Sequence, residues 1–531
     1  MIDGAMQTYA LTLDKFIDHA AKWHPNVEVV TARGDGGVDR IGYAPLRARA
    51  RRVSGALSDL GVRFGDRVAT LAWNSQSHME AWYAIMGMGA VCHTLNPRQT
   101  AGELAAMLKQ SEARVLIVSA DLLTKAKQII ESVPSVAHLL VIDGALPEDL
   151  KGANLTASMA ALETMLAAAA DDVVWGEFDE NAASGLCFTS GTTGAPKGVT
   201  YTHRSSFLHT LRLLHADVFA ITSTDVVLPV VPMFHANAWG LPFATPAAGA
   251  KLVLPGRATD GASLAELIVS ENVTVAVGVP TVWLGLVEHL EANGGDVPSL
   301  KRIIVGGSAL APALMKRIER RLGVIVQTSW GMTELSPLGT SASPLDVSRD
   351  ASVSGRPGIG VDLLLKDSEG EELPEQRNAE GRLHVRGAAV VSRYFGHRER
   401  ATDENNWFDT GDLAKIDDDG NLIITGRAKD LIKSGGEWIN PVEIETVVGA
   451  LPQVSLVAVI GRSDPKWGER PILLVELREN QSISDEELLE PLHGRVASWW
   501  LPDEVVRVQT MPLAPTGKID KMRLRSEYNS A

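Results

Sequence analysis

The segment from Cys187 to Gly198, CFTSGTTGAPKG, gathers hydroxyl side chains, glycines and a lysine on a short stretch of chain. Glycines let backbone N–H groups approach phosphate oxygens closely, because no side chain keeps the ligand away. The hydroxyls add hydrogen-bond donors, and the lysine adds a positive charge. An apolar run leads into the segment, so it should leave a strand. It therefore predicts a phosphate-binding loop, built from Thr189, Ser190, Gly191, Thr192, Thr193, Gly194 and Lys197.

This loop differs from the P-loop of nucleoside triphosphatases, G-x-x-x-x-G-K-[ST]. Pro196 stands where that motif needs the glycine before its lysine, and Gly198 stands where it needs a metal-binding hydroxyl. A plain turn rich in glycine and serine is the structural alternative, but a turn does not require so many hydroxyls beside a lysine. The sequence therefore favours a phosphate loop of another class.

The loop resembles the signature loop of the adenylate-forming superfamily, which comprises acyl-CoA synthetases, peptide-synthetase adenylation domains and firefly luciferases. Further segments resemble the superfamily's motifs in the expected order: Trp330-Gly-Met-Thr-Glu334, Phe408-Asp-Thr-Gly-Asp412, Gly426 to Glu445, and Pro515-Thr-Gly-Lys-Ile519. Taken singly, such short segments are also typical of turns and helix starts. Their joint occurrence over residues 187–523 resembles most the bacterial medium- and long-chain fatty acyl-CoA ligases and the 3-(methylthio)propionate-CoA ligases.

The resemblance implies a role for each segment. The loop would hold the β- and γ-phosphates of ATP, Trp330 would stack on adenine, and Asp412 would accept both ribose hydroxyls. Glu334 and Thr189 would hold Mg²⁺, which prefers oxygen ligands. The implied catalytic residues are Lys518, Glu334, Thr333 and His235. Other implied binding residues for ATP and coenzyme A are Gly307, Ser308, Thr328, Ser329, Gly331, Met332, Arg427, Lys429, Lys433, Gly435, Gly436 and Trp438.

Lys429 resembles the hinge residue of the superfamily, about which a small C-terminal domain rotates between two half-reactions. Gly435 and Gly436 lack side chains and would let the pantetheine arm of coenzyme A pass closely. Several luciferases and coumarate ligases have a lysine where Gly435 stands, so no lysine role is assigned there. We expect an adenylating domain at 1–428 and a mobile C-terminal domain at 429–531, with the hinge at Lys429 and a catalytic lysine at Lys518.

The segment from Pro232 to Gly240, PMFHANAWG, resembles fatty acyl-CoA ligases in which a histidine lies beside the acyl carboxylate and a tryptophan gates the acyl tunnel. Simple packing in the core is the alternative for both side chains. The expected substrate residues are His235, Trp239, Val279, Gly306, Gly307 and Met332, with Val277 and Trp283 also in the pocket. These residue types predict an apolar pocket, which favours a medium-chain fatty, methylthio-alkanoic or arylalkanoic acid.

Short apolar runs and helical patterns alternate through roughly the first two thirds of the chain. A helix is predicted over 44–60, and another from Pro312 to a stop at Gly323. Runs short enough for buried strands lie at Val68–Ala72, Arg114–Ser119, Leu139–Asp143, Val226–Val231, Lys251–Leu254, Val273–Val279 and Arg302–Val305. Such alternation predicts an α/β fold with largely parallel sheets.

After about residue 350 the pattern changes to short alternating strands, such as Leu383–Val385, punctuated by glycine. The last part of the chain is typical of a small α+β unit, with strands near Leu456–Ile460 and Ile472–Leu477. The predicted fold class is therefore α/β: a large N-terminal domain of α/β subdomains plus a β-rich subdomain, followed by a small mobile α+β C-terminal domain.

The bulk composition excludes several other classes of protein. The chain has 531 residues, 45% hydrophobic and 22% charged, which is typical of a globular protein with several subdomains. A net charge of −15 disfavours nucleic acid and anionic lipid as partners. No signal-peptide pattern or membrane span is expected. Two cysteines are too few for a disulfide framework or zinc site, so a cytoplasmic protein with buried, reduced thiols is predicted.

The resemblance predicts an AMP-forming acyl-CoA synthetase that uses ATP, Mg²⁺ and coenzyme A. The alternatives are an adenylating enzyme that loads a carrier protein, a luciferase-type oxygenase, and a non-catalytic nucleotide-binding protein. Little chain follows Lys518, so no fused carrier is expected, and the presence of Glu334 and Lys518 argues against the non-catalytic alternative. The likeness alone gives the expectation of a homodimer.

Overall fold

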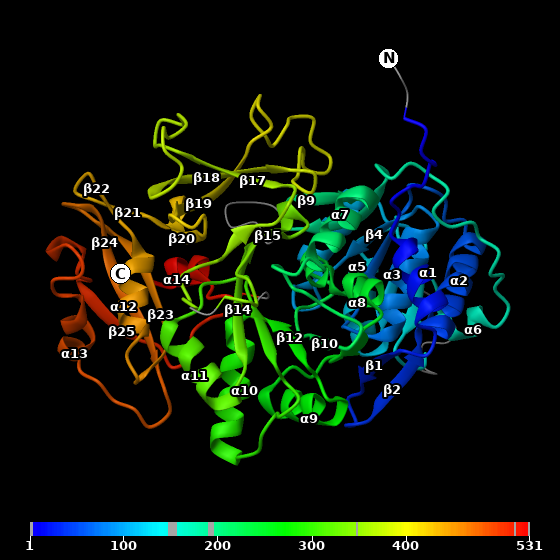
Figure 1. Ribbon diagram of the computed structural model, residues 1–531, viewed down its shortest axis with the longest axis horizontal. Coiled ribbons are helices and arrows are strands. Elements are labelled where there is room, and N and C mark those ends of the chain that lie inside the picture. Colours follow the sequence, from blue (N-terminus) through cyan, green and yellow to red (C-terminus); the bar gives the residue numbers. More distant parts are fainter. Residues whose placement is uncertain (1–3, 147–156, 190–195, 347–348, 515–516, 529–531) are drawn as a thin grey trace.

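The computed structural model describes residues 4–146, 157–189, 196–346, 349–514 and 517–528. In Figure 1 two α/β regions, blue to green, occupy the right and centre of the molecule. A β-rich region, yellow, lies above them, and the C-terminal unit, orange to red, lies at the left. The predicted order of α/β, β-rich and α+β parts is therefore found along the chain.

The first sheet has seven strands in the order β7-β6-β5-β3-β4-β8-β9 among the described residues. Its strands pair in parallel except for β9, which runs antiparallel to β8. The strands are β3 Arg67–Leu71, β4 Val91–Thr94, β5 Val115–Ser119, β6 His138–Ile142, β7 Ser158–Ala161, β8 Ala183–Phe188 and β9 Gly198–Thr202. Three of the seven runs predicted as strands lie in this sheet, as β3, β5 and β6, and the other four lie in the second sheet.

The second sheet has the order β16-β15-β14-β13-β12-β10-β11-β1-β2 in the described chain. It is parallel from β14 to β1, with antiparallel strands at both edges, so the prediction of largely parallel sheets is confirmed. The strands are β1 Glu28–Ala32, β2 Val38–Gly42, β10 Val226–Pro229, β11 Lys251–Leu254, β12 Val275–Gly278, β13 Arg302–Val305, β14 Ile325–Gly331, β15 Leu338–Ser341 and β16 Arg356–Pro357.

Helices separate and cover the two sheets, because both faces of a parallel sheet must be buried. One core joins both sheets to α1 Asp14–Trp23, α2 Tyr43–Asp59, α3 Gln76–Gly87 and α8 Leu241–Ala248. A second core packs α9 Gly261–Glu271, α10 Pro280–Asn293 and α11 Pro312–Leu322 on the second sheet. A third packs α4 Ala101–Ser111 and α5 Leu123–Ile130 on the first sheet. The remaining helices here are α6 Leu162–Leu166 and α7 His203–Leu213.

Two predicted helices are found within one residue of their predicted bounds. The helix expected over 44–60 is α2. Helix α11 begins with Pro312 in its first turn and ends before Gly323, which adopts φ +66°. Glycine reaches this left-handed conformation without steric cost, so it terminates the helix as the sequence pattern predicts.

The β-rich region is a four-stranded antiparallel sheet. Its strands are β17 Val361–Lys366, β18 Ala379–Gly387, β19 Phe408–Ile416 and β20 Leu422–Arg427. Along β19 buried residues alternate with more exposed ones, the pattern of a sheet with one covered face. That alternation brings Asp412 to the covered face.

The C-terminal unit has a sheet in the order β22-β21-β24-β23, with β25 beside β24. Cores on its two faces hold α12 and α13 on one side and α14 on the other. Its elements are β21 Ile432–Ser434, β22 Glu437–Ile439, α12 Pro441–Gly449, β23 Val454–Asp464, β24 Gly468–Leu477, α13 Asp485–Leu489, β25 Glu504–Arg507 and α14 Lys521–Tyr528. The predicted boundary falls in the 3₁₀ turn Ala428–Asp430, which links this sheet to β20; the division itself stays a prediction.

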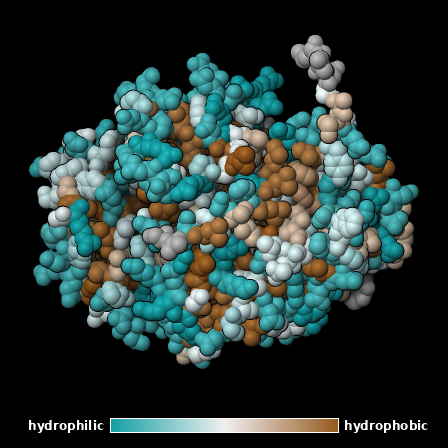
Figure 2. Space-filling view, in the orientation of Figure 1, coloured by the Kyte–Doolittle hydropathy of each residue, from teal (hydrophilic) through white to brown (hydrophobic). Residues whose placement is uncertain are grey.

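Within the described residues, no helix has both the length and the apolar character needed to cross a membrane. Figure 2 shows a face dominated by hydrophilic residues, with apolar ones gathered toward its middle. Cys92 and Cys187 are free and buried, as predicted.

Candidate active site

The predicted phosphate loop lies between β8 and β9, which pair as far as Phe188 and Gly198. The Thr189 N–H donates to the Lys197 carbonyl over 2.9 Å and closes the base of the loop. The strand expected before the loop is therefore present. Five of its predicted ligands, Ser190, Gly191, Thr192, Thr193 and Gly194, lie outside the described residues.

Glu334 lies in the 3₁₀ turn Thr333–Leu335, which directly follows β14. Its buried carboxylate accepts a hydrogen bond of 2.9 Å from Tyr394 Oη at Oε1. Tyr201 Oη donates over 2.8 Å to the Thr333 carbonyl and holds the same turn. Burial raises the pKa of Glu334, against the opposing effect of the Tyr394 hydrogen bond. The turn therefore presents one buried carboxylate beside the phosphate loop.

Mg²⁺ usually takes only one or two protein carboxylates and completes its shell with phosphates and water. In the described part of the chain no group of three or more His, Cys, Asp and Glu side chains could form a metal site. Apart from Tyr394, no described side chain donates to the Glu334 carboxylate, so its Oε2 suits a cation held jointly with nucleotide phosphates. The donor set therefore fits Mg²⁺ bound with ATP better than a resident all-protein metal site.

Asp412, Arg427 and Trp330 meet at one point, although each stands on a different strand. Asp412 on β19 is paired across the sheet with Arg427 on β20, and Arg427 Nε lies 2.5 Å from Asp412 Oδ1. Trp330 on β14 donates its indole N–H to Asp412 Oδ2 over 2.9 Å. Burial raises the pKa of Asp412, and Arg427 is the strongest opposing influence. The residues predicted for ribose and adenine are therefore directly bonded to each other.

The Trp330 ring packs against Gly339, where an added Cβ would lie 2.4 Å from the ring. Only a glycine there leaves room for the indole. The ring is 8% exposed, so it has little free surface in this structure. The predicted stacking of adenine on Trp330 stays a prediction.

Replacing Trp330 with phenylalanine should raise the KM for ATP roughly tenfold and leave kcat almost unchanged, because one hydrogen bond to an ionised group is lost while the ring is kept. Initial rates of pyrophosphate release at varied ATP would measure this. Trp407→Phe is the matched control, since Trp407 stacks with Arg386 4.3 Å away and has no described bond to Asp412. Equal KM values for the Trp330 variant and the parent would contradict the role.

Lys518 reaches the same point from the C-terminal segment. The Thr281 hydroxyl at the start of α10 donates to the Gly517 carbonyl over 3.4 Å and docks this segment on the N-terminal region. Burial, followed by the Arg427 charge, lowers the pKa of the half-buried Lys518 to about 8, against the opposing effect of Asp412. The Lys518 ammonium group is therefore close enough to the carboxylates of Asp412 and Glu334 for their charges to affect its pKa.

The rate of adenylation should fall as the pH rises through about 8, because the Lys518 ammonium form is lost there. The sign follows from the lowered pKa, which makes the charged form disappear at a lower pH than for an exposed lysine. The pH profile of kcat/KM for pyrophosphate release would measure it. Lys518→Arg should lose this alkaline limb, because guanidinium stays protonated; the same limb in both proteins would contradict the assignment.

The backbone turn from Ala236 to Trp239, directly after His235, is strained. Four residues without glycine's freedom, Ala236, Asn237, Ala238 and Trp239, have φ between +40° and +52°. Left-handed backbone costs an L-residue about 1–2 kcal/mol, so packing must hold this turn in place. Burial, followed by the Lys518 charge, lowers the pKa of His235 to about 4. A neutral imidazole therefore lies near the Lys518 ammonium.

The predicted acyl residues converge beside this turn. A Cβ built on Gly306 would lie 2.9 Å from the Trp239 ring, so these two residues are in close contact. One built on Gly307 would lie 3.3 Å from Val279 and 3.9 Å from Lys518 Cε. Met332 is half-buried against the β-rich core. Val277 and Trp283, also expected in the pocket, are completely buried, and their place in the pocket stays a prediction.

Other residues predicted to bind the nucleotide form hydrogen bonds within the protein in this conformation. Thr328 Oγ1 donates to the Val353 carbonyl over 2.5 Å, and Ser329 Oγ donates to the Val305 carbonyl over 3.1 Å. Gly331 and Met332 form the end of β14 and the residue after it. Ser308 is exposed after β13. These residues line the same end of the second sheet.

The β21–β22 hairpin lies away from this point, at the outer edge of the C-terminal unit in Figure 1. Lys433 Nζ lies 5.3 Å from the ring of Trp438, which is 52% exposed. Gly435 and Gly436 form the tight turn, with φ +62° and +92°. A Cβ at Gly435 would lie 2.8 Å from the Trp467 ring, so a side chain at this position would require the ring to move. Lys429 is exposed in the 3₁₀ turn between the sheets.

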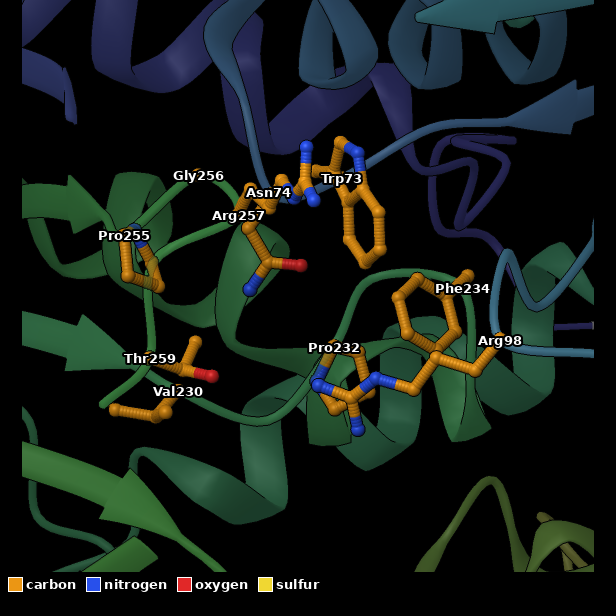
Figure 3. Close-up of a pocket in the computed structure, with 10 residues that line it drawn as sticks. All are labelled: Trp73, Asn74, Arg98, Val230, Pro232, Phe234, Pro255, Gly256, Arg257 and Thr259. Carbon is orange, nitrogen blue, oxygen red and sulfur yellow. The ribbon is translucent and has the colours of Figure 1, made fainter. Parts of the chain in front are cut away.

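A small cleft opens beside the segment that leads to His235. Figure 3 shows the Arg98 side chain running past Phe234 toward Pro232, and Arg257 on the opposite rim. Asn74 fixes this segment, because it donates to two of its carbonyls and accepts the Met233 N–H over 2.7 Å. The lining residues are Trp73, Asn74, Arg98, Val230, Pro232, Phe234, Pro255, Gly256, Arg257 and Thr259.

Sequence reasoning missed Tyr394 and Arg98. Tyr394 precedes Phe395 and Gly396 in a region without a diagnostic spacing, so nothing local marks its contact with Glu334. Arg98 had a weak signal, since a Pro-Arg pair follows an apolar run that ends near the edge of a parallel sheet. Predicting either residue requires knowing which strand ends lie side by side in the fold.

The chain belongs to the family of AMP-binding enzymes, whose model matches residues 17–395. The model of the AMP-binding enzyme C-terminal domain matches residues 443–518. The chain is 41% identical to the 3-methylmercaptopropionyl-CoA ligase of Ruegeria lacuscaerulensis, covering 99% of both chains. It is also 41% identical to the medium-chain-fatty-acid–CoA ligase of Ectopseudomonas oleovorans, covering 99% of this chain and 97% of that one. The predicted superfamily is therefore confirmed.

Solved structures share the whole fold. The anthranilate CoA ligase AuaEII in complex with anthranoyl-AMP superposes with a TM-score of 0.88 at 25% identity, covering 99% of both chains. ATP-bound MatB from Rhodopseudomonas palustris gives 0.85 at 26% identity, covering 98% of this chain and 99% of that one. The fold is thus that of adenylate-forming enzymes, including one with an acyl-adenylate bound.

Proposed function

We propose that this chain is an ATP-dependent acyl-CoA ligase. It activates an apolar carboxylic acid as an acyl-adenylate with release of pyrophosphate, then forms the acyl-CoA thioester with release of AMP. The observation that carries this proposal is the meeting of Lys518 with Asp412, Arg427 and Glu334 beside the Trp239 and Gly307 surface. A single site thus contains residues suited to bind a nucleotide, a metal-bound phosphate and an apolar acid.

The first step joins two anions, because the acid's carboxylate attacks the α-phosphate. A new C–O–P linkage forms, the bond between the α- and β-phosphates breaks, and pyrophosphate leaves. Lys518 is placed to offset the charge that develops on the α-phosphate, and Asp412 would anchor the ribose. Mg²⁺ held by Glu334 and Thr189 would supply further positive charge to the phosphates. The loop at 189–198 would hold the departing pyrophosphate.

The second step needs the coenzyme A thiol close to the acyl carbon. A C–S bond forms, the C–O bond to the phosphate breaks, and AMP leaves. We propose that the C-terminal domain turns about Lys429 and brings the Gly435–Gly436 hairpin to this site in place of Lys518. The outward position of that hairpin in this structure supports a movement between the two half-reactions.

The cleft with Arg98 and Arg257 would take the phosphate end of coenzyme A, because guanidinium groups pair well with phosphates. Its wall ends at Phe234, the residue before His235, so an arm bound there has a short way to the acyl carbon. Arg98→Ala should raise the KM for coenzyme A roughly tenfold without changing adenylation. Separate assays of pyrophosphate release and thioester formation would test this, with exposed Arg398→Ala as control. Loss of both half-reactions would contradict it.

The acid is proposed to be a medium-chain fatty, methylthio-alkanoic or arylalkanoic acid. The contact of Trp239 with Gly306 supports a pocket of limited depth. The names of the two relatives at 41% identity, a 3-methylmercaptopropionyl-CoA ligase and a medium-chain-fatty-acid–CoA ligase, support the same range. Cytoplasmic location and assembly as a homodimer are further proposals that rest on this likeness.

The test is release of pyrophosphate and AMP with ATP, Mg²⁺ and a panel of acids, with and without coenzyme A. The panel runs from 3-(methylthio)propionate through straight-chain fatty acids to arylpropionates. Turnover that requires coenzyme A would establish the ligase and identify the acid class. Adenylation without such turnover would favour a carrier protein or oxygen as second substrate. No release with any acid would favour a nucleotide-binding protein without this activity.

A further inference from the structure

The segment that connects β18 to β19 forms backbone hydrogen bonds with two separate parts of the proposed nucleotide site. Its Val391 N–H donates over 2.8 Å to the Glu334 carbonyl, and its Phe395 N–H donates over 2.7 Å to the Gly198 carbonyl. Glu334 follows β14 of the second sheet, whereas Gly198 opens β9 of the first sheet. This connection therefore fixes the spacing between the metal-binding turn and the base of the phosphate loop.

The side chain of Tyr394 repeats this link within the site itself. Its Oη donates over 2.9 Å to Glu334 Oε1, and Lys197 Nζ lies 4.9 Å from the centre of its ring. A cation over the face of an aromatic ring is attracted by the ring's quadrupole. One half-buried side chain thus touches both the carboxylate and the lysine that the phosphates would contact.

A glutamate side chain can turn either oxygen toward a metal unless something fixes its orientation. The Tyr394 hydrogen bond occupies Oε1, and no other described side chain donates to this carboxylate. Hydrogen bonds to metal-binding carboxylates from neighbouring groups orient them and change metal affinity. Tyr201 offers a contrast, because it donates to the backbone of the same turn and leaves the carboxylate alone.

We propose that Tyr394 is a positioning residue: its hydroxyl holds Glu334 with Oε2 directed to the Mg²⁺ that accompanies ATP, and its ring holds Lys197 beside the same phosphates. This inference rests on the proposed function, because it assigns the metal of that reaction. It concerns the metal-dependent part of nucleotide binding, and it does not require Tyr394 to touch any reacting atom.

The test is calorimetric titration with α,β-methylene-ATP, which cannot release pyrophosphate, once with Mg²⁺ and once with EDTA. The ratio of the two affinities measures the contribution of the metal. Tyr394→Phe should reduce this ratio roughly tenfold and leave the affinity in EDTA nearly unchanged, because only a bond to the metal-binding carboxylate is lost. Replacing Mg²⁺ by Mn²⁺ and counting bound Mn²⁺ by electron paramagnetic resonance should show the same loss.

Tyr201→Phe is the matched control, since it removes a hydroxyl bonded to the same turn, and its ratio should equal that of the parent. In a Glu334→Gln background, Tyr394→Phe should have no further effect on the ratio. Any of three results would overturn the inference about Tyr394 and leave the proposed function standing. These are an unchanged ratio in Tyr394→Phe, an equal loss in Tyr201→Phe, or a full effect of Tyr394→Phe in the Glu334→Gln background. Failure of the parent protein to bind the analogue would overturn the proposed function as well.

Discussion

Replacing Lys518 with alanine should lower the rate of acyl-adenylate formation by about a thousandfold, because a preorganised charge at the reacting phosphate is lost. The charges of Asp412 and Glu334 act on this ammonium, and burial lowers its pKa to about 8, so it is still mostly charged near neutral pH. The protein should remain folded, since the Ala514 N–H donates to the backbone carbonyl of Lys518, a bond that the substitution retains. Pyrophosphate release in single-turnover experiments would measure the loss.

Measuring the second half-reaction distinguishes a role of Lys518 in adenylation from a general loss of structure. When the acyl-adenylate is supplied, Lys518→Ala should form the thioester at a rate within about threefold of the parent, because a group used only in the adenylating transition state should not affect the later step. Lys466→Ala is the control, as it removes an exposed lysine from the same C-terminal unit. An equal loss in both half-reactions would show that Lys518 supports structure rather than adenylation.

The layers of this fold could be predicted from the sequence, because the spacing of apolar residues and the positions of turn residues determine helices and strands locally. Helix α11 ends at Gly323 through a conformation that glycine alone adopts easily, and the pattern of β19 turns Asp412 to the covered face. The order of motifs predicted that Asp412, Arg427 and Lys518 would share a site, and the structure brings them together. Their catalytic roles remain predictions.

Contacts between segments that are far apart in the sequence could not be predicted from such local patterns. Tyr394 and Glu334 are 60 positions apart, and Trp330 and Asp412 are 82 apart, so no spacing rule connects them. The left-handed turn after His235 has no glycine or proline to announce it before Gly240, because surrounding packing rather than local preference holds its backbone.

Replacing Lys429 with proline should leave adenylation within about threefold of the parent and lower thioester formation by at least about a hundredfold. Proline fixes φ near −65°, which agrees with the 3₁₀ conformation of the turn Ala428–Asp430 in this structure. The adenylating arrangement with Lys518 at the site is therefore retained. A rotation of the C-terminal domain about this residue requires a different φ, which proline does not allow.

The two half-reactions should be measured separately, by pyrophosphate release without coenzyme A and by thioester formation from supplied acyl-adenylate. Lys429→Ala is the control, because it removes the same exposed side chain and leaves the backbone free to turn, so it should support both steps. If proline impaired the two steps equally, the turn would be a structural element rather than a hinge. If it impaired neither, the domain would have to rotate about another residue of the link between β20 and β21, or the thiol would have to reach the acyl-adenylate with Lys518 still in place.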